Sequence, residues 1–403
     1  MDRRTFRKAM LSTLLLVLAL SVEHVVAQNR TTEQEEAAIK DPNAECATYT
    51  LPITTSNSAS FPEVGKKASI LPNDSVAKAK WDEMSGKVLS TAPKPAAGKS
   101  NGYDASDPDC WWTFDQCTTP KAQGVPPDVV MVPPPSTMGY GFDDGPYCGH
   151  NEFYDFLKSN NQTATMFFIG SNVFQWPLEA QRALVDGHEI CTLGRIRTVQ
   201  AIKLIAGVTP TCFRPPYGDI DDRVRSIAAG LGLQSILWSY DSQDADVGTS
   251  GVTEQSVDDS YNSFISTAKN GTFGSAGTIL LEHEVDNYTV SKAMEYYPQL
   301  KQAFKYMVPV GVALNKTQPY VETNFTLPSF EQYIAGTTVV TAAPTSTSAS
   351  SASASATAEA TPTSTQGDSQ NLSNAGFVTI GMPPATMMIT CFVFSALAFV
   401  SVL

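Results

Sequence analysis

The chain has 403 residues, a formal net charge of −13 and a sequence pI near 4.8. This length allows one catalytic domain with appendages. The excess of acidic over basic residues argues against nucleic acid and anionic lipid as partners. The sequence does not define the oligomeric state. An even set of cysteines in a secreted chain predicts disulfides, with the pairing left open. Cys391 lies in the C-terminal apolar run, and the other six of the seven cysteines lie between the two apolar ends of the chain: Cys46, Cys110, Cys117, Cys148, Cys191 and Cys212.

The first 27 residues have the pattern of a secretory signal peptide. Basic residues precede an apolar run over residues 10–22, and small residues at 25–27 offer a cleavage site before Gln28. The apolar run is too short for a comfortable membrane span. Secretion gives meaning to eight N-x-S/T sequons, of which we expect some to carry glycans. They are Asn29, Asn73, Asn161, Asn270, Asn287, Asn315, Asn324 and Asn371.

Residues 28–134 form a polar, proline- and glycine-rich segment with little periodicity. We interpret it as an N-terminal extension that wraps the following domain. Trp111 and Trp112, flanked by Cys110 and Cys117, are its main sign of local packing. A Trp pair can stack on a sugar, but it is more often a buried plug, and we favour the plug here.

Residues 135–315 alternate short apolar runs with helix-period segments. Residues 165–169 read as a buried strand, Asn151 as the cap of a helix, and Pro177 as the start of another. Such alternation predicts an α/β domain with parallel strands. Chemistry in such folds collects at the carboxyl ends of the strands. Four polar residues each follow a predicted strand: Asp143, Arg214, Asp241 and His283.

Asp143 and Asp144 are adjacent carboxylates at a strand-to-turn corner, within Gly-Phe-Asp-Asp-Gly-Pro at 141–146. Two such charges inside a domain repel each other unless a cation or a proton lies between them. With a divalent metal, one carboxylate can ligate the ion and the other can take a proton from bound water. The alternative is a plain surface turn.

The C-terminal part contains no catalytic pattern. We interpret residues 316–336 as a wrap of the domain and the Ser/Thr/Ala-rich residues 337–374 as an extended stalk. Residues 375–403 have the order of a GPI-attachment propeptide, with Asn374 or Ser373 as the attachment site. A tail-anchored span is the alternative. This pattern predicts a protein held by a GPI lipid at the plasma membrane and cell wall.

Four motifs occur in a fixed order: residues 141–146, Arg-Pro-Pro-Tyr-Gly-Asp at 214–219, Asp-Ser-Gln-Asp at 241–244, and Leu-Glu-His at 281–283. In this order the chain resembles the NodB-type polysaccharide deacetylases (carbohydrate esterase family 4), and among them the fungal chitin deacetylases. The resemblance covers residues 135–310. It implies an incomplete, distorted (β/α) barrel that uses Zn²⁺ or Co²⁺ to hydrolyse the N-acetyl groups of chitin, which gives chitosan and acetate.

The resemblance also implies a role for each motif residue. Asp143 is expected to be the catalytic base, held ionised by Arg214, and Asp144 the metal ligand. The backbone N–H of Tyr217 is expected to face the developing oxyanion. His283 is expected to be the acid that protonates the leaving amine. Either Asp241 or Asp244 orients His283 and keeps it charged.

The chain departs from the family after Ile190. The family places a pair of metal-binding histidines there, but Cys191 to Gln200 contains no histidine, and the segment up to Gly207 is shorter. A catalytic zinc site normally has three protein ligands. His188 is not the usual ligand, and His150 is expected at the surface. Ala245 also stands where the family often has Trp.

Two explanations of this departure are open. Either the written sequence lacks coding residues, or the protein has lost its metal site and persists as a catalytically inactive polysaccharide-binding or structural wall protein. A third interpretation, a glycoside hydrolase that uses the carboxylates at 143–144 and 241–244, predicts chain shortening without acetate release.

Overall fold

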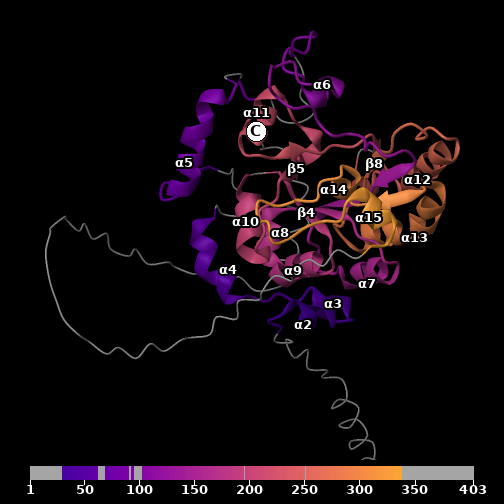
Figure 1. Cartoon of the computed structure of the whole chain (residues 1–403). Coiled ribbons are helices and arrows are strands. Elements are labelled where there is room, and N and C mark those ends of the chain that lie inside the picture. The colour runs from indigo at the N-terminus through magenta and orange to yellow at the C-terminus, as the bar shows by residue number, and fades with distance from the viewer. Residues whose placement is uncertain are drawn as a thin grey trace, which may run out of the picture. The chain divides into compact units, whose positions relative to one another are not determined.

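The computed structural model describes residues 30–61, 69–89, 92–94, 102–194, 196–249 and 251–337 (Figure 1). The predicted signal peptide, Asn29, Asn371, Asn374 and all but the first residue of the stalk lie outside this part. Within these ranges, no helix is long and apolar enough to cross a membrane.

The strands form two parallel sheets. In the first sheet the order is β2 (Gly141–Gly145), β3 (Thr165–Phe168), β4 (Glu189–Leu193), β5 (Cys212–Arg214) and β6 (Gln234–Ser235). In the second it is β7 (Tyr240–Asp241), β8 (Thr278–Leu281), β1 (Thr137–Gly139) and β9 (Tyr306–Val308).

The two sheets join into a ring. β1 runs through Tyr140 into β2, and a parallel bridge pairs Asp143 with His283 just past β8. On the opposite side, the chain passes from β6 to β7 within five residues and so moves from one sheet to the other. The α/β class and the incomplete, distorted (β/α) barrel are therefore confirmed.

Helices between the strands cover the ring (Figure 1). β3 and β4 are buried along their whole length, as expected of parallel strands covered on both faces. The covering helices are α7 (Asn151–Ser159), α8 (Gly170–Gln175), α9 (Pro177–Val185), α10 (Ile196–Ala206), α11 (Asp222–Gly230), α12 (Glu254–Lys269) and α13 (Asn287–Ala303). Two short helices follow: α14 (Val310–Ala313) and α15 (Phe330–Ile334).

The segment before the barrel contains short helices that pack on it. They are α2 (Glu33–Ala37), α3 (Pro42–Glu45), α4 (Pro52–Asn57), α5 (Ser75–Met84) and α6 (Trp112–Asp115). α2 packs against α9, and Cys46 forms a disulfide with Cys148 of the barrel domain. Residues 102 positions apart are thereby tied together.

A buried polar network lies under this contact. The Glu45 carboxylate accepts the backbone N–H of Asn151 at 2.6 Å, while the Asn151 side chain donates to the Glu36 carbonyl at 2.9 Å and accepts from Arg182. Asn151 is the first residue of α7 and not its cap, so the prediction that it caps this helix was wrong. A glutamate from the extension satisfies the N–H group instead.

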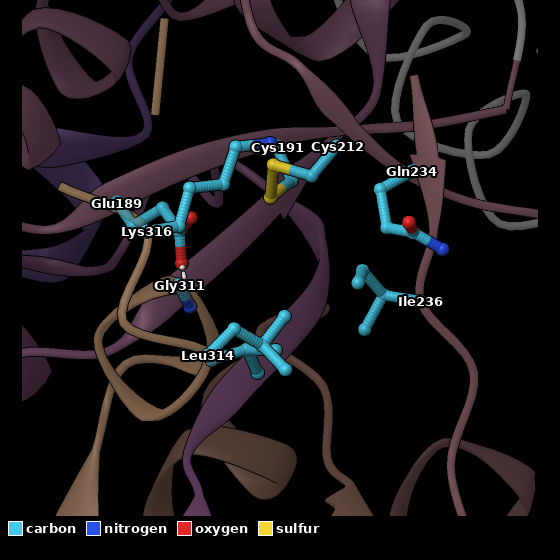
Figure 2. Close-up of a pocket in the computed structure, with 9 residues that line it drawn as sticks. Glu189, Cys191, Cys212, Gln234, Ile236, Gly311, Leu314 and Lys316 are labelled. Atoms are coloured by element: carbon cyan, nitrogen blue, oxygen red, sulfur yellow. Dashed lines mark hydrogen bonds between the residues drawn. A yellow bond between two sulfur atoms is a disulfide. The ribbon is translucent and has the colours of Figure 1, made fainter. Parts of the chain in front are cut away.

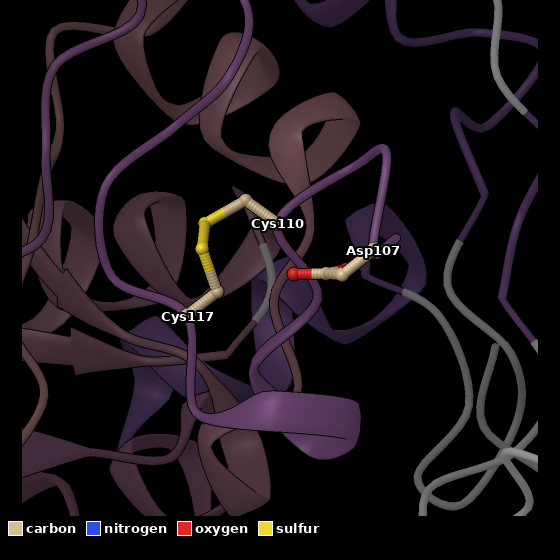
Figure 3. Close-up of side chains that lie close together, drawn as sticks. All are labelled: Asp107, Cys110 and Cys117. Carbon is tan, nitrogen blue, oxygen red and sulfur yellow. A yellow bond between two sulfur atoms is a disulfide. The ribbon is translucent and has the colours of Figure 1, made fainter. Parts of the chain in front are cut away.

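The six described cysteines form three disulfides, as the even count predicts. Cys191 and Cys212 join β4 to β5 (Figure 2). Cys110 and Cys117 close a short loop beside Trp111 (Figure 3). Trp111 is fully buried and its indole N–H donates to Asp219 at 2.6 Å, so it is a plug. Trp112 is half-buried and packs edge-on against Trp238.

Candidate active site

Asp143, in the middle of β2, and Arg214, the last residue of β5, form a buried ion pair. Nη1 of Arg214 donates to Oδ1 of Asp143 at 2.6 Å. The guanidinium is fully buried; it also donates to the carbonyls of Ile236 and Leu237, at 3.2 and 3.3 Å, and lies 3.9 Å above the Phe167 ring. These contacts fix Arg214, which therefore holds the Asp143 carboxylate in one orientation.

Burial governs the charge of this pair. It raises the pKa of Asp143 to about 6, although the positive charges of Arg214 and His283 work against the increase. Burial likewise lowers the pKa of Arg214, and the Asp143 carboxylate opposes that change. A carboxylate with a pKa near 6 is ionised at neutral pH and is a stronger base than an exposed aspartate.

His283 is held by Asp244 through two hydrogen bonds. Nδ1 of the imidazole lies 2.6 Å from Oδ1 of Asp244, and the backbone N–H of His283 donates to Oδ2 at 2.9 Å. Burial works against a charged imidazole, but the Asp244 carboxylate outweighs it and raises the pKa of His283 to about 10. With Nδ1 engaged, Nε2 is the nitrogen left to deliver a proton.

The structure selects between the two aspartates that the sequence leaves open. Asp244 is 1% exposed and contacts His283 directly. Asp241 is exposed, and its Oδ1 accepts the backbone N–H of Gln243 at 2.8 Å. This geometry favours Asp244 for the orienting role, and Asp241 stays a predicted site residue, since the charge of His283 also acts on its carboxyl group.

Asp144 and Tyr217 both have left-handed backbones, with φ of 70° and 59°. Such conformations cost free energy in a non-glycine residue and cluster at functional sites. The Asp144 carbonyl accepts the Asn172 side chain at 2.8 Å, and burial raises the pKa of the half-buried Asp144 carboxyl. The Tyr217 side chain is 54% exposed, and its pKa is raised by burial and then by Asp144. The oxyanion role of its N–H stays a prediction.

The donor set around Asp144 does not fit a catalytic zinc or cobalt site. The sequence contains four histidines, of which His24 lies outside the described residues. His188 directly precedes β4 and is buried, and its Nδ1 accepts a hydrogen bond from the backbone N–H of Ala164 at 3.1 Å. His150 is fully buried and stacks on Tyr154, so the prediction of a surface position was wrong.

Two other groups of potential metal ligands exist in the described part of the chain, and both contain disulfide sulfurs. One joins Asp107 to Cys110 and Cys117 (Figure 3), and the other joins Glu189 to Cys191 and Cys212 (Figure 2). Because the thiolate is the metal-binding form of cysteine, neither group offers soft ligands. Glu189 instead accepts hydrogen bonds from Thr165 and from the backbone of Gly311.

The segment in which the family pattern places the histidine pair, residues 191–200, includes the end of β4 and the start of α10. β4 ends at Leu193 and α10 begins at Ile196, so two residues separate them. Thr198 of α10 lies close against Gly170 of α8, and Arg197 pairs with Asp74 of the extension at 2.5 Å. α10 therefore fills the space beside α8 without bringing a metal ligand to Asp144.

The comparisons with known proteins agree with the family that the motifs indicate. A family model described as polysaccharide deacetylase matches residues 132–194 and 196–236. Chitin deacetylase 2 of Cryptococcus neoformans var. grubii is 45% identical over 340 residues, which cover 78% of this chain and 75% of that protein. The chain belongs to the polysaccharide deacetylase family.

Further relatives of this polysaccharide deacetylase include the chitin deacetylase of Amylomyces rouxii, which is 38% identical over 72% of this chain and 74% of its own length. Among solved structures, the chitin deacetylase of Colletotrichum lindemuthianum matches with a TM-score of 0.41 and 24% identity, over 48% of this chain and 94% of that one.

Sequence reasoning missed several residues that shape the site. Phe167, under the Arg214 guanidinium, reads in the sequence as an ordinary core residue of a buried strand. Asn172 binds the Asp144 carbonyl from a helix with no distinguishing pattern. In both cases the signal is a contact between distant segments, which a motif search along the chain does not register.

Proposed function

We propose that this protein hydrolyses the N-acetyl groups of N-acetylglucosamine units in cell-wall chitin and so yields chitosan and acetate. The observation that carries the proposal is the pairing of Asp143 with His283 across neighbouring strands, each held by its own buried partner, Arg214 or Asp244. This geometry sets a base and an acid of opposite charge side by side. The names of the relatives supply the substrate.

The proposed chemistry uses these residues in sequence. Asp143 accepts a proton from a water molecule as that water attacks the amide carbonyl. The backbone N–H of Tyr217 donates to the oxyanion that forms. His283 protonates the nitrogen as the carbon–nitrogen bond breaks, which releases acetate and leaves a free amine on the sugar. Since the residues present do not complete a metal site, no step is assigned to a metal.

Acetate release tests the proposal. Purified protein is incubated with N-acetylglucosamine oligomers, with and without added zinc or cobalt, and both acetate and chain length are measured. Acetate formation at constant chain length supports the proposal. Chain shortening without acetate supports a glycoside hydrolase instead.

One observation favours a second candidate, a non-catalytic wall protein that binds polysaccharide. Among the described histidines, His283 is the one whose charge acts on Asp144. Chitin binding without acetate release, and without bound zinc, would support it. Sequencing the mature transcript across the codons for residues 187–207 helps to decide between the deacetylase and the non-catalytic protein. An additional histidine pair there would complete the metal site and favour the deacetylase.

We also propose a surface location and a domain plan. In this plan the protein is carried to the plasma membrane and wall by its two terminal signals. The parts are a secretory signal at 1–27, an extension at 28–134, a deacetylase domain at 135–315, a wrap at 316–336, a stalk at 337–374 and a GPI propeptide at 375–403. The six described sequons, Asn73, Asn161, Asn270, Asn287, Asn315 and Asn324, are all exposed. Release of the protein from cells by a GPI-specific phospholipase tests the anchor.

A further inference from the structure

A cavity of about 290 Å³ lies beside the pair formed by Asp244 and His283. Its walls come from the 3-10 turn η4 (Asp244–Asp246), the first residue of α12, and the start of α13. Ala245 supplies only a methyl group to one wall, and Val285, 39% exposed, marks the side that is open to solvent. The cavity therefore opens next to the residue that delivers the proton.

The lining combines apolar and acidic groups. Ala245 and Val285 present methyl groups, while Glu254 and Asp286 add carboxylates. The hydroxyl of Tyr288 is buried and has no hydrogen-bond partner among the described residues. The lining includes no lysine or arginine. Apolar groups suit the C–H face of a sugar ring, and polar groups suit its hydroxyls. The excess of negative charge adds a preference for a cation.

We propose that this cavity seats a glucosamine unit, whose protonated amine lies near Glu254 and Asp286. Its volume lies near the lower limit for small-ligand pockets, about 300 Å³, which suits one hexosamine ring. The inference rests on the proposed function, because the unit bound here would be a neighbour of the unit that reacts. It follows that the protein prefers chitin that is already partly deacetylated, and that each product amine becomes a recognition element for the next unit.

Binding measurements test this selectivity independently of catalysis. Calorimetric titrations with short oligomers of glucosamine and of N-acetylglucosamine are compared at about pH 5.5, where the amine is charged and exposed carboxylates are mostly ionised. We expect Glu254→Gln to weaken the glucosamine oligomer about fivefold, the effect of one partly exposed charge pair. The acetylated oligomer should keep its affinity. Because Glu254 is exposed, the substitution should not disturb folding.

The control is Asp259→Asn, which removes an exposed charge from the same helix outside the cavity lining. A second variant, Ala245→Trp, should fill the cavity and weaken both oligomers. The proposal is overturned if Glu254→Gln leaves the ratio of the two affinities unchanged, or if Asp259→Asn changes that ratio equally. Acetate release, measured in parallel, reports separately on the proposed function: selective binding without acetate refutes catalysis but not the cavity.

Discussion

Glu45 provides a quantitative test of how the extension is attached to the barrel. Its carboxyl group is 3% exposed and accepts the first backbone N–H of α7. Burial raises the pKa of Glu45 to about 8. Burial also raises the pKa of two neighbouring carboxyls, that of Glu36 to about 7 and that of Glu179 to about 8. The hydrogen bond from the Asn151 backbone N–H opposes the shift of Glu45, as do the smaller effects of the charges of Arg182 and Arg30.

The sign of the pH dependence follows from these raised values. In the unfolded chain a glutamate ionises near pH 4.3, whereas these carboxyls stay protonated in the folded protein up to about pH 7 or 8. Their contribution is therefore fully present below about pH 4 and is lost as the pH rises through the folded pKa values. Each group reduces the free energy of unfolding by up to about 1.4 kcal/mol per pH unit in that window.

Glu45→Gln keeps an oxygen acceptor for the Asn151 N–H but removes the titration. We expect denaturant unfolding between about pH 5 and pH 8, with disulfides intact, to show a slope smaller by about 1 kcal/mol per pH unit than in the parent. Glu331→Gln, at an exposed position of α15, is the control and should reproduce the parent slope. An unchanged slope in Glu45→Gln would refute the assignment of a protonated, buried carboxyl.

Three further predictions concern the site. His283→Ala should reduce acetate release by about 10²- to 10⁴-fold, as expected for loss of a general acid. The dissociation constant for N-acetylglucosamine oligomers should change by less than about twofold. A parallel loss of activity and of affinity would assign His283 to binding. Arg214→Met should lower the free energy of unfolding by about 3–5 kcal/mol, because it leaves Asp143 buried without its partner; a smaller loss would mean that Asp143 is protonated in the fold. Asp144→Asn should leave the zinc content after dialysis unchanged, since one carboxylate alone binds zinc weakly; a fall in bound zinc would reveal ligands that this donor set does not include.

The elements that the sequence predicted best are those set by local pattern. Strand–helix alternation placed Asp143, Arg214 and His283 after strands, and the parallel topology then brings them to one edge. The choice between Asp241 and Asp244 depends on which carboxylate the turn after β7 directs inward. That choice is a tertiary fact, because both residues have the same local chemistry.

The parts that could not be predicted depend on contacts between distant segments. Glu45 and Asn151 are 106 residues apart, and each reads alone as an ordinary polar residue. His150 is fully buried and stacks on Tyr154, and neither of its ring nitrogens has a hydrogen-bond partner among the described residues. A polar side chain is normally expected at the surface, and only the assembled fold shows which polar groups are buried and which of them are hydrogen-bonded.

The charges of the site show what the missing histidines change. Asp143 is balanced by Arg214 and His283 by Asp244, so both catalytic groups keep an ordered partner without a metal. Asp144 has no such cation beside it: the positive group that acts on it is His283, already paired with Asp244. Burial accordingly raises the pKa of Asp144, and its left-handed backbone adds strain. The base and the acid can therefore persist in this chain without a metal, whereas Asp144 combines a buried carboxyl that lacks a cation of its own with a left-handed backbone.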